Sequence, residues 1–222
     1  MNCIIASSKK WFVLEDFQSN INVKFHFISK REDLNSENLE EIQPNFIFFP
    51  HWNWYVEPKI FNNYNCVLFH TAPLPYGRGG SPIQNLILKG FESSPVCAIK
   101  MDESLDGGPI YLKKDISLKG SLREIFLEIN TVVNQMIREI IETKPKALKQ
   151  IGKPVIFKRI DPGDNEINNS LTIKELYDKI RMLDAEDYPK AFIKFGDYVL
   201  EFSSAKIVGK KVNAIVEIKE CK

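Results

Sequence analysis

A histidine, His70, stands at the end of a short apolar run in the stretch CVLFHTAPLPYGRGGSP. Pro73 and Pro75 follow it among several small residues, so we expect a tight turn that holds the histidine at the end of a strand. Imidazole takes up and returns a proton near neutral pH, which makes a positioned histidine a candidate general acid or base. A lone histidine at a strand end is more often structural, so this loop does not decide its role by itself.

A second loop carries carboxylates that could pair with that histidine. The stretch KMDESLDGG contains Asp102, Glu103 and Asp106 beside two glycines. A carboxylate next to an imidazole orients the ring and raises its basicity. The alternative is a solvated turn, because Asp and Gly are also favoured turn residues. Which of the three carboxylates would face the histidine stays open at this point.

Short apolar runs alternate with helical patterns through the first half of the chain. The runs are NCIIAS, VKFHFIS, NFIFFP and CVLFH, and charged or mixed stretches such as EDLNSENLEEIQ separate them. This order predicts an α/β fold with a Rossmann-like, mostly parallel sheet and flanking helices. Such sheets bind ligands beyond the carboxyl ends of their strands, where ASSKKW, PHWNWYVEP and HTAPLPYGRGGSP follow. None of these loops has a GxGxxG or P-loop pattern, so any phosphate must be held in another way.

The second half of the chain predicts one long helix and a smaller appended subdomain. SLREIFLEINTVVNQMIREIIET places Ile125, Ile129, Val132, Met136 and Ile140 on one apolar face, with Ser121 and Glu124 as a capping box. The basic, proline-containing stretch KPKALKQIGKP marks a boundary near residue 150. We therefore expect a main domain at residues 1–150 and a small α+β C-terminal subdomain at residues 151–222.

Composition narrows the possible partners and surroundings. Thirty Lys and Arg residues balance 29 Asp and Glu residues, and the formal net charge is +1. No overall basic field therefore attracts nucleic acid. The first residues, MNCIIASSKKWFVLEDF, hold an apolar run too short for a signal peptide or a membrane span, so we expect a cytoplasmic protein with no membrane partner. The four cysteines lack metal-ligand spacing and predict neither a metal site nor a disulfide framework.

The stretch HTAPLPYGRGGSPIQNLI resembles, position for position, the loop of the formyltransferases that use 10-formyltetrahydrofolate. In that family a histidine is followed by a small-residue turn, Leu-Pro, two residues, Arg-Gly and a further Pro. The family also has an aspartate in a Leu-Asp-Xaa-Gly loop, and SLDGGPI supplies Asp106 at the expected spacing. NFIFFPHWNWYVEPKIF looks like the strand and loop of the folate pocket. FKRIDPGDNEIN and IKELYDKIRMLDAEDYPKAFIKFGD look like the shortened second domain that follows in these enzymes.

The resemblance implies an enzyme that moves a formyl group from 10-formyltetrahydrofolate to an amine, with residues 1–150 as the catalytic domain and no metal. His70 would manage protons and Asp106 would be its partner. Candidate contacts to folate or to the second substrate are Pro50, Trp52, Tyr76, Arg78, Gly79, Gln84, Met101 and Asp102. Trp52 and its neighbour Trp54 are almost as well explained by packing. Arg78 either positions an anion or braces the loop, and bracing is slightly favoured.

One position departs from the family pattern. The family has an asparagine two residues before the histidine, where it helps to hold the oxyanion, and this chain has Leu68 there. An oxyanion donor is worth about 3 kcal/mol of barrier. Candidate replacements are protonated His70, a backbone N–H of the loop, or the side chain of Asn53 or Asn85. Sequence alone does not choose between the two asparagines.

The acceptor is expected to be a small molecule. The place after the first strand reads ASSKKW rather than a glycine-rich phosphate loop, which disfavours the purine-pathway branch. Near-neutral charge and short length disfavour an initiator-tRNA enzyme. PLPYGRGGSPIQNLI, together with Leu68, resembles a compact branch that formylates nucleotide-linked amino sugars. The resemblance implies a 4-amino-4,6-dideoxy sugar as the acceptor, on a route such as that to pseudaminic acid. Alternatives are another amine, on methionyl-tRNA or a peptide-synthetase substrate, or a protein that binds folate or a nucleotide sugar without catalysis. Oligomeric state stays open.

Overall fold

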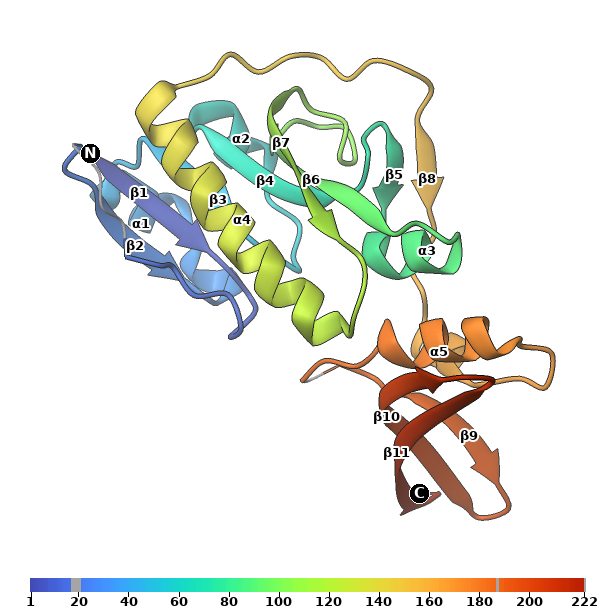
Figure 1. Ribbon diagram of the computed structural model, residues 1–222. Coiled ribbons are helices and arrows are strands. Elements are labelled where there is room, and N and C mark those ends of the chain that lie inside the picture. Colours follow the sequence, from blue (N-terminus) through green and yellow to red (C-terminus); the bar gives the residue numbers. More distant parts are fainter. Residues whose placement is uncertain (17–20, 187, 222) are drawn as a thin grey trace. The chain divides into compact units, whose positions relative to one another are not determined.

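The computed structural model describes residues 1–16, 21–186 and 188–221 (Figure 1). Its largest sheet has six strands in the order β2-β1-β3-β4-β6-β7. The strands are β1 (Asn2–Ala6), β2 (Lys24–Ile28), β3 (Phe46–Phe49), β4 (Cys66–Thr71), β6 (Ser93–Lys100) and β7 (Ile110–Ser117). Strands β1 to β4 pair with one another in parallel, and β6 runs antiparallel to β4. The predicted α/β fold with a mostly parallel sheet is confirmed.

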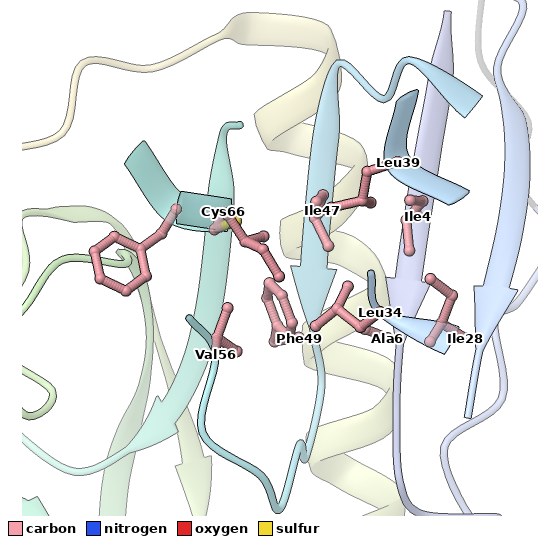
Figure 2. Packing of buried hydrophobic residues seen from close by; sticks show 11 residues of the cluster. Ile4, Ala6, Ile28, Leu34, Leu39, Ile47, Phe49, Val56 and Cys66 are labelled. Carbon is pink, nitrogen blue, oxygen red and sulfur yellow. The ribbon is translucent and has the colours of Figure 1, made fainter. Parts of the chain in front are cut away.

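Helices cover both faces of this sheet, which is why its central strands are apolar on both sides. On one face, α1 (Ser36–Ile42) and α2 (Pro58–Asn63) follow β2 and β3 in the chain. Leu39 of α1 packs there against buried side chains of β1 and β3 (Figure 2), and Ile60 of α2 belongs to the same buried cluster. Both views place α4 (Leu122–Thr143) on the opposite face. The strands can therefore present polar chemistry only at their ends.

Helix α4 begins as the sequence predicts. The side chain of Glu124 accepts hydrogen bonds from the backbone N–H of Ser121 at 2.7 Å and from its hydroxyl at 2.8 Å, and Ser121 Oγ accepts from the N–H of Glu124. The buried stripe is shifted slightly from the predicted one. Val133 is fully buried while Val132 is half-buried, because a helix turns 3.6 residues per turn and drifts from a strict spacing.

The loop after β4 forms a short sheet and a helix. Strand β5 (Tyr76–Gly79) pairs with β8 (Val155–Phe157), and α3 (Pro82–Leu88) follows. The Leu74–Pro75 peptide bond is cis. Ser81 is the residue that precedes α3, but its hydroxyl accepts from the N–H of Ile160 and does not cap the helix. The described residues also form two 3-10 turns, η1 (Arg31–Asp33) and η2 (Pro162–Asn165).

The chain divides into two compact units, and each is built from separate stretches of sequence. The first unit comprises residues 1–78, 95–116 and 128–156, and the second comprises residues 79–94, 117–127 and 157–222. The second unit contains α5 (Ile173–Arg181) and an antiparallel sheet in the order β11-β10-β9. Its strands are β9 (Ala191–Phe195), β10 (Tyr198–Val208) and β11 (Lys211–Glu220). The predicted α+β character of the C-terminal region is confirmed. The domain boundary near residue 150 stays a prediction.

Buried polar contacts hold the second unit together across its separate stretches. Arg181 of α5 pairs with Asp178 at 2.7 Å and donates to the carbonyls of Leu118 and Gly120. A buried guanidinium with all these partners satisfied anchors the C-terminal region to the turn before α4. No described helix is long and apolar enough to cross a membrane.

Candidate active site

His70 lies at the carboxyl end of β4, and its ring is held between two acceptors. Its Nε2 is 2.7 Å from the carbonyl oxygen of Gly77, and its Nδ1 is 3.5 Å from Oδ2 of Asp106. A carbonyl oxygen can only accept, so Nε2 carries a hydrogen. Only 8 % of the His70 surface is exposed. Gly77 has a φ of 86°, a conformation suited to glycine, and this turn aims its carbonyl at the ring.

Asp106 is the carboxylate that faces His70. Its φ is 47°, in the left-handed region that residues other than glycine rarely adopt. The two glycines behind it are tightly enclosed. A Cβ on Gly108 would lie 1.8 Å from the carbonyl oxygen of Lys100, and one on Gly107 would lie 2.8 Å from Nη1 of Arg78. The loop between β6 and β7 therefore needs glycine at both positions to place Asp106.

Asp102 has a different task from Asp106. Its Oδ1 accepts a hydrogen bond from the N–H of Ser104 at 2.8 Å and another from the Ser104 hydroxyl. Its side chain is exposed, and this bonding closes the turn that precedes Asp106. Glu103 is exposed as well. The structure thus answers the question that the sequence left open, because only Asp106 of the three pairs with the histidine.

Arg78 follows Gly77 and makes no contact with an acidic side chain among the described residues. Its Nε and Nη2 donate to Oε1 of Gln150 at 3.1 and 2.7 Å. This arrangement agrees with a bracing role for Arg78. The sequence does not predict Gln150 as a site residue. It lies in the irregular stretch after α4, and no motif includes it.

Three partly buried apolar side chains lie on the same face of the sheet as His70. Leu68, two residues before His70 on β4, packs against the buried cluster together with Trp52 and Met101. Trp52 also packs edge-on against Trp54, with ring centroids 4.8 Å apart. The Nε1 of Trp52 is buried and has no hydrogen-bond partner among the described residues. Packing thus explains the Trp52 ring, while its N–H remains a buried donor without an acceptor.

The predicted site residues fall into both compact units. Pro50, Trp52, Asn53, Tyr76, Arg78, Met101 and Asp102 belong to the first unit with His70 and Asp106, whereas Gly79, Gln84 and Asn85 belong to the second. The buried amide of Gln84 donates to the carbonyl of Met182 at 3.3 Å and to the Tyr188 hydroxyl at 3.1 Å.

The two candidate oxyanion donors are in opposite situations. The amide nitrogen of Asn85 donates toward three carbonyls, those of Gly80, Ser81 and Lys158, at 3.0 to 3.2 Å. Its two hydrogens are therefore already used within its own unit. Asn53 is exposed in the loop after β3, and the described structure gives its side chain no hydrogen bond.

A histidine–aspartate pair at the carboxyl edge of a parallel α/β sheet defines a site suited to moving protons during group transfer. Among the described residues, no cluster of His, Cys, Asp or Glu is arranged to hold a metal ion. Comparisons with known proteins relate the chain, rather than this site alone, to a family. Residues 162–219 match the model of the methionyl-tRNA formyltransferase C-terminal domain.

Solved structures resemble the whole chain. A structure described as methionyl-tRNA formyltransferase from Clostridium thermocellum is 41% identical, with a TM-score of 0.93 and 99% of each chain covered. A sugar N-formyltransferase from Shewanella sp. FDAARGOS_354 has a TM-score of 0.69 at 16% identity and covers 94% of this chain and 99% of its own. The chain belongs to the formyltransferase family.

Curated relatives are longer than this chain. The methionyl-tRNA formyltransferase of Sulfurihydrogenibium sp. (strain YO3AOP1) is 26% identical over 191 residues, which are 81% of this chain and 60% of that protein. The chain thus spans about three fifths of this relative's length. The predicted family is confirmed.

Proposed function

We propose that this protein is an N-formyltransferase that moves the formyl group of 10-formyltetrahydrofolate to the amine of a nucleotide-linked amino sugar. The observation that carries the proposal is the His70–Asp106 pair, buried at the end of β4 beside the cis Leu74–Pro75 turn. Membership of the formyltransferase family supports the class of reaction.

The pair suits the proton balance of formyl transfer. The amine attacks the formyl carbon, a new C–N bond forms, and the bond from the carbon to N10 of the folate breaks. The amine loses one proton and N10 gains one, so a group that accepts and returns a proton serves both halves. His70 fills that role, and the carboxylate of Asp106, 3.5 Å from Nδ1, orients its ring.

Features on the His70 face fit a folate. Leu68, Trp52 and Met101 supply apolar surface for a flat ring system, and the buried N–H of Trp52 is a donor that still needs an acceptor. A buried donor left unpaired costs about 1–3 kcal/mol, so a ligand acceptor there would recover that cost. Trp52 and Met101 would line the folate, and Pro50, buried at the end of β3, would support the Trp52 loop.

Asn53 is the side chain best suited to replace the missing family asparagine. Leu68 cannot donate a hydrogen bond, and Asn85 has already used its amide hydrogens. Asn53 follows β3, and β3 is the parallel neighbour of β4, so its loop and His70 leave the sheet at the same edge. We assign the oxyanion contact to the Asn53 amide.

The charge balance supports a small acceptor. A protein that binds tRNA through its phosphates relies on a basic surface, and this chain has a net charge of +1. Methionyl-tRNA is the second candidate acceptor, because the 41% identical structure from Clostridium thermocellum carries the methionyl-tRNA formyltransferase name. The same His70 chemistry serves either amine.

Mass spectrometry separates these alternatives. The protein is mixed with 10-formyltetrahydrofolate and, in parallel, with a panel of nucleotide-linked amino sugars or with methionyl-tRNA. A mass gain of one carbonyl on a 4-amino sugar is the expected result. A gain only on methionyl-tRNA would replace the acceptor and keep the reaction. No gain on any acceptor, with folate still bound, would overturn the enzymatic proposal.

A further inference from the structure

We propose that Gln150 is a positioning residue that joins the two loops on either side of His70. For its kinetic consequences this inference rests on the proposed function. Gln150 Oε1 accepts from Nε and Nη2 of Arg78 at 3.1 and 2.7 Å. Its Nε2 donates to the carbonyls of Asp106 at 2.8 Å and Gly108 at 3.0 Å.

The chemistry of the partners fixes which way this amide points. A guanidinium only donates and a backbone carbonyl only accepts, so the oxygen of Gln150 must face Arg78 and the nitrogen must face Asp106 and Gly108. Both lone pairs of the oxygen and both hydrogens of the nitrogen are then used. An amide that makes all of its hydrogen bonds is held in one orientation. It also holds the groups to which it is bonded at fixed positions.

The two partners of Gln150 belong to the two loops that contact the His70 ring. Arg78 is bonded in sequence to Gly77, whose carbonyl accepts from Nε2 of His70. Asp106 supplies the carboxylate beside Nδ1. Gln150 therefore sets the spacing between the two groups that hold the imidazole, although it does not touch the ring itself.

The backbone at Asp106 needs such support. A φ of 47° at a residue other than glycine is a strained conformation that persists only where the surroundings enforce it. The bonds from Gln150 to the carbonyls of Asp106 and Gly108 bracket the turn on both sides of Gly107. Arg78 approaches the same turn closely, because its Nη1 would lie only 2.8 Å from a Cβ on Gly107.

Only glutamine among the common side chains offers this combination at this length. A glutamate could still accept from Arg78, but it has no hydrogen to give to the two carbonyls. A leucine has neither function. Gln150→Glu and Gln150→Leu therefore remove one half or both halves of the connection. Ile151→Ala is the matched control, because Ile151 is the next residue and is 91% exposed.

A direct test reads the His70 ring by NMR and needs no substrate. The chain has three histidines, so ring signals in long-range ¹H–¹⁵N spectra can be assigned with single substitutions. In Gln150→Leu the His70 signals are expected to move toward those of Asp106→Asn, while His26 and His51 keep theirs. Gln150→Glu should move them in the same direction. If Gln150→Leu misfolds, Gln150→Glu decides alone, and wild-type His70 signals in Gln150→Glu would overturn the proposal.

Kinetics give a second readout. Both Gln150 variants are expected to lower kcat about 10- to 100-fold, with KM changed less than about twofold, because the acid–base group is misplaced while substrate contacts remain. Ile151→Ala should match the wild type. An unchanged kcat in Gln150→Leu contradicts the inference. If the wild type itself transfers no formyl group, the proposed function fails, and the ring signals still decide the role of Gln150.

Discussion

Two neighbouring parallel strands lead to histidines at the same edge of the sheet, and the two rings have opposite surroundings. After β3, the His51 ring packs against Trp11 with ring centroids 4.1 Å apart. Burial, with a smaller contribution from the charge of Lys9, lowers the pKa of His51 to about 3. At β4, the His70 ring lies between the carbonyl of Gly77 and the carboxylate of Asp106. The His51 ring is thus held neutral by burial, whereas the His70 ring lies between two hydrogen-bond acceptors.

The backbone around His51 shows what that residue contributes. Its φ is 58°, and its carbonyl accepts from the N–H of Ser8 at 3.3 Å and from the Ser8 hydroxyl at 2.7 Å. These bonds tie the loop after β3 to the loop after β1. His51 therefore shapes the edge of the sheet through its backbone and its packing. Position at a strand end therefore does not by itself decide the role of a histidine.

Removing the catalytic pair should have the largest effect. His70→Ala and Asp106→Ala are each expected to lower kcat/KM by about 10²- to 10⁴-fold, because the general acid–base step is lost or misoriented. The measurement is formyl transfer to whichever acceptor the mass-spectrometric panel identifies. His51→Asn is the matched control and should stay within about threefold of the wild type, since asparagine tolerates a left-handed φ. Near-full activity in His70→Ala, or a His51→Asn loss as large as that of His70→Ala, would reverse the assignment of the two histidines.

The sequence predicted the end of β4 that carries His70 better than the surroundings of that histidine. Periodicity and turn residues were enough to predict the strands of the first half, α4 with its Ser121 cap, and the turn after His70. The pair of His70 with Asp106 followed from the family motif. These features depend on local patterns, and local patterns are what a single sequence records.

Features that depend on contacts between distant segments could not be predicted in the same way. Gln150 bonds to Arg78 and Asp106 only after three stretches of chain fold together, and nothing in KQIGKP distinguishes it. Asn85 looked as suitable as Asn53 until its contacts with three carbonyls were known. The neutral state of His51 arises from burial, which residue type does not reveal. The compact units likewise interleave separate stretches because of contacts such as that of Arg181 with the Leu118 carbonyl.

The next effect tests whether the loop after β3 contributes to the reaction through its asparagine. Asn53→Ala should lower kcat by about 10²-fold with little change in KM, as expected for the loss of one oxyanion donor. Asn85→Ala is the comparison, because its amide supports backbone carbonyls. It should lower the free energy of unfolding by about 1–3 kcal/mol in urea titrations. An Asn53→Ala enzyme with wild-type kcat would leave the oxyanion to backbone N–H groups or to protonated His70.

The smallest effect is the pH dependence of stability that the lowered pKa of His51 causes. Its folded pKa of about 3 lies below its ordinary value of 6.5, so below pH 6.5 the unfolded chain binds a proton that the folded chain does not. As the pH is lowered from 6.5 to 3, the free energy of unfolding should therefore fall by at most about 1.4 kcal/mol for each pH unit. Urea titrations at pH 7 and pH 5 measure this slope.

Other groups also titrate there, so the informative quantity is the difference between the wild type and His51→Asn, which has no proton to gain. The variant should lose less stability than the wild type on going from pH 7 to pH 5. Equal losses would mean that His51 accepts its proton in the folded state, and the contrast with His70 would then rest on the partners of the rings alone.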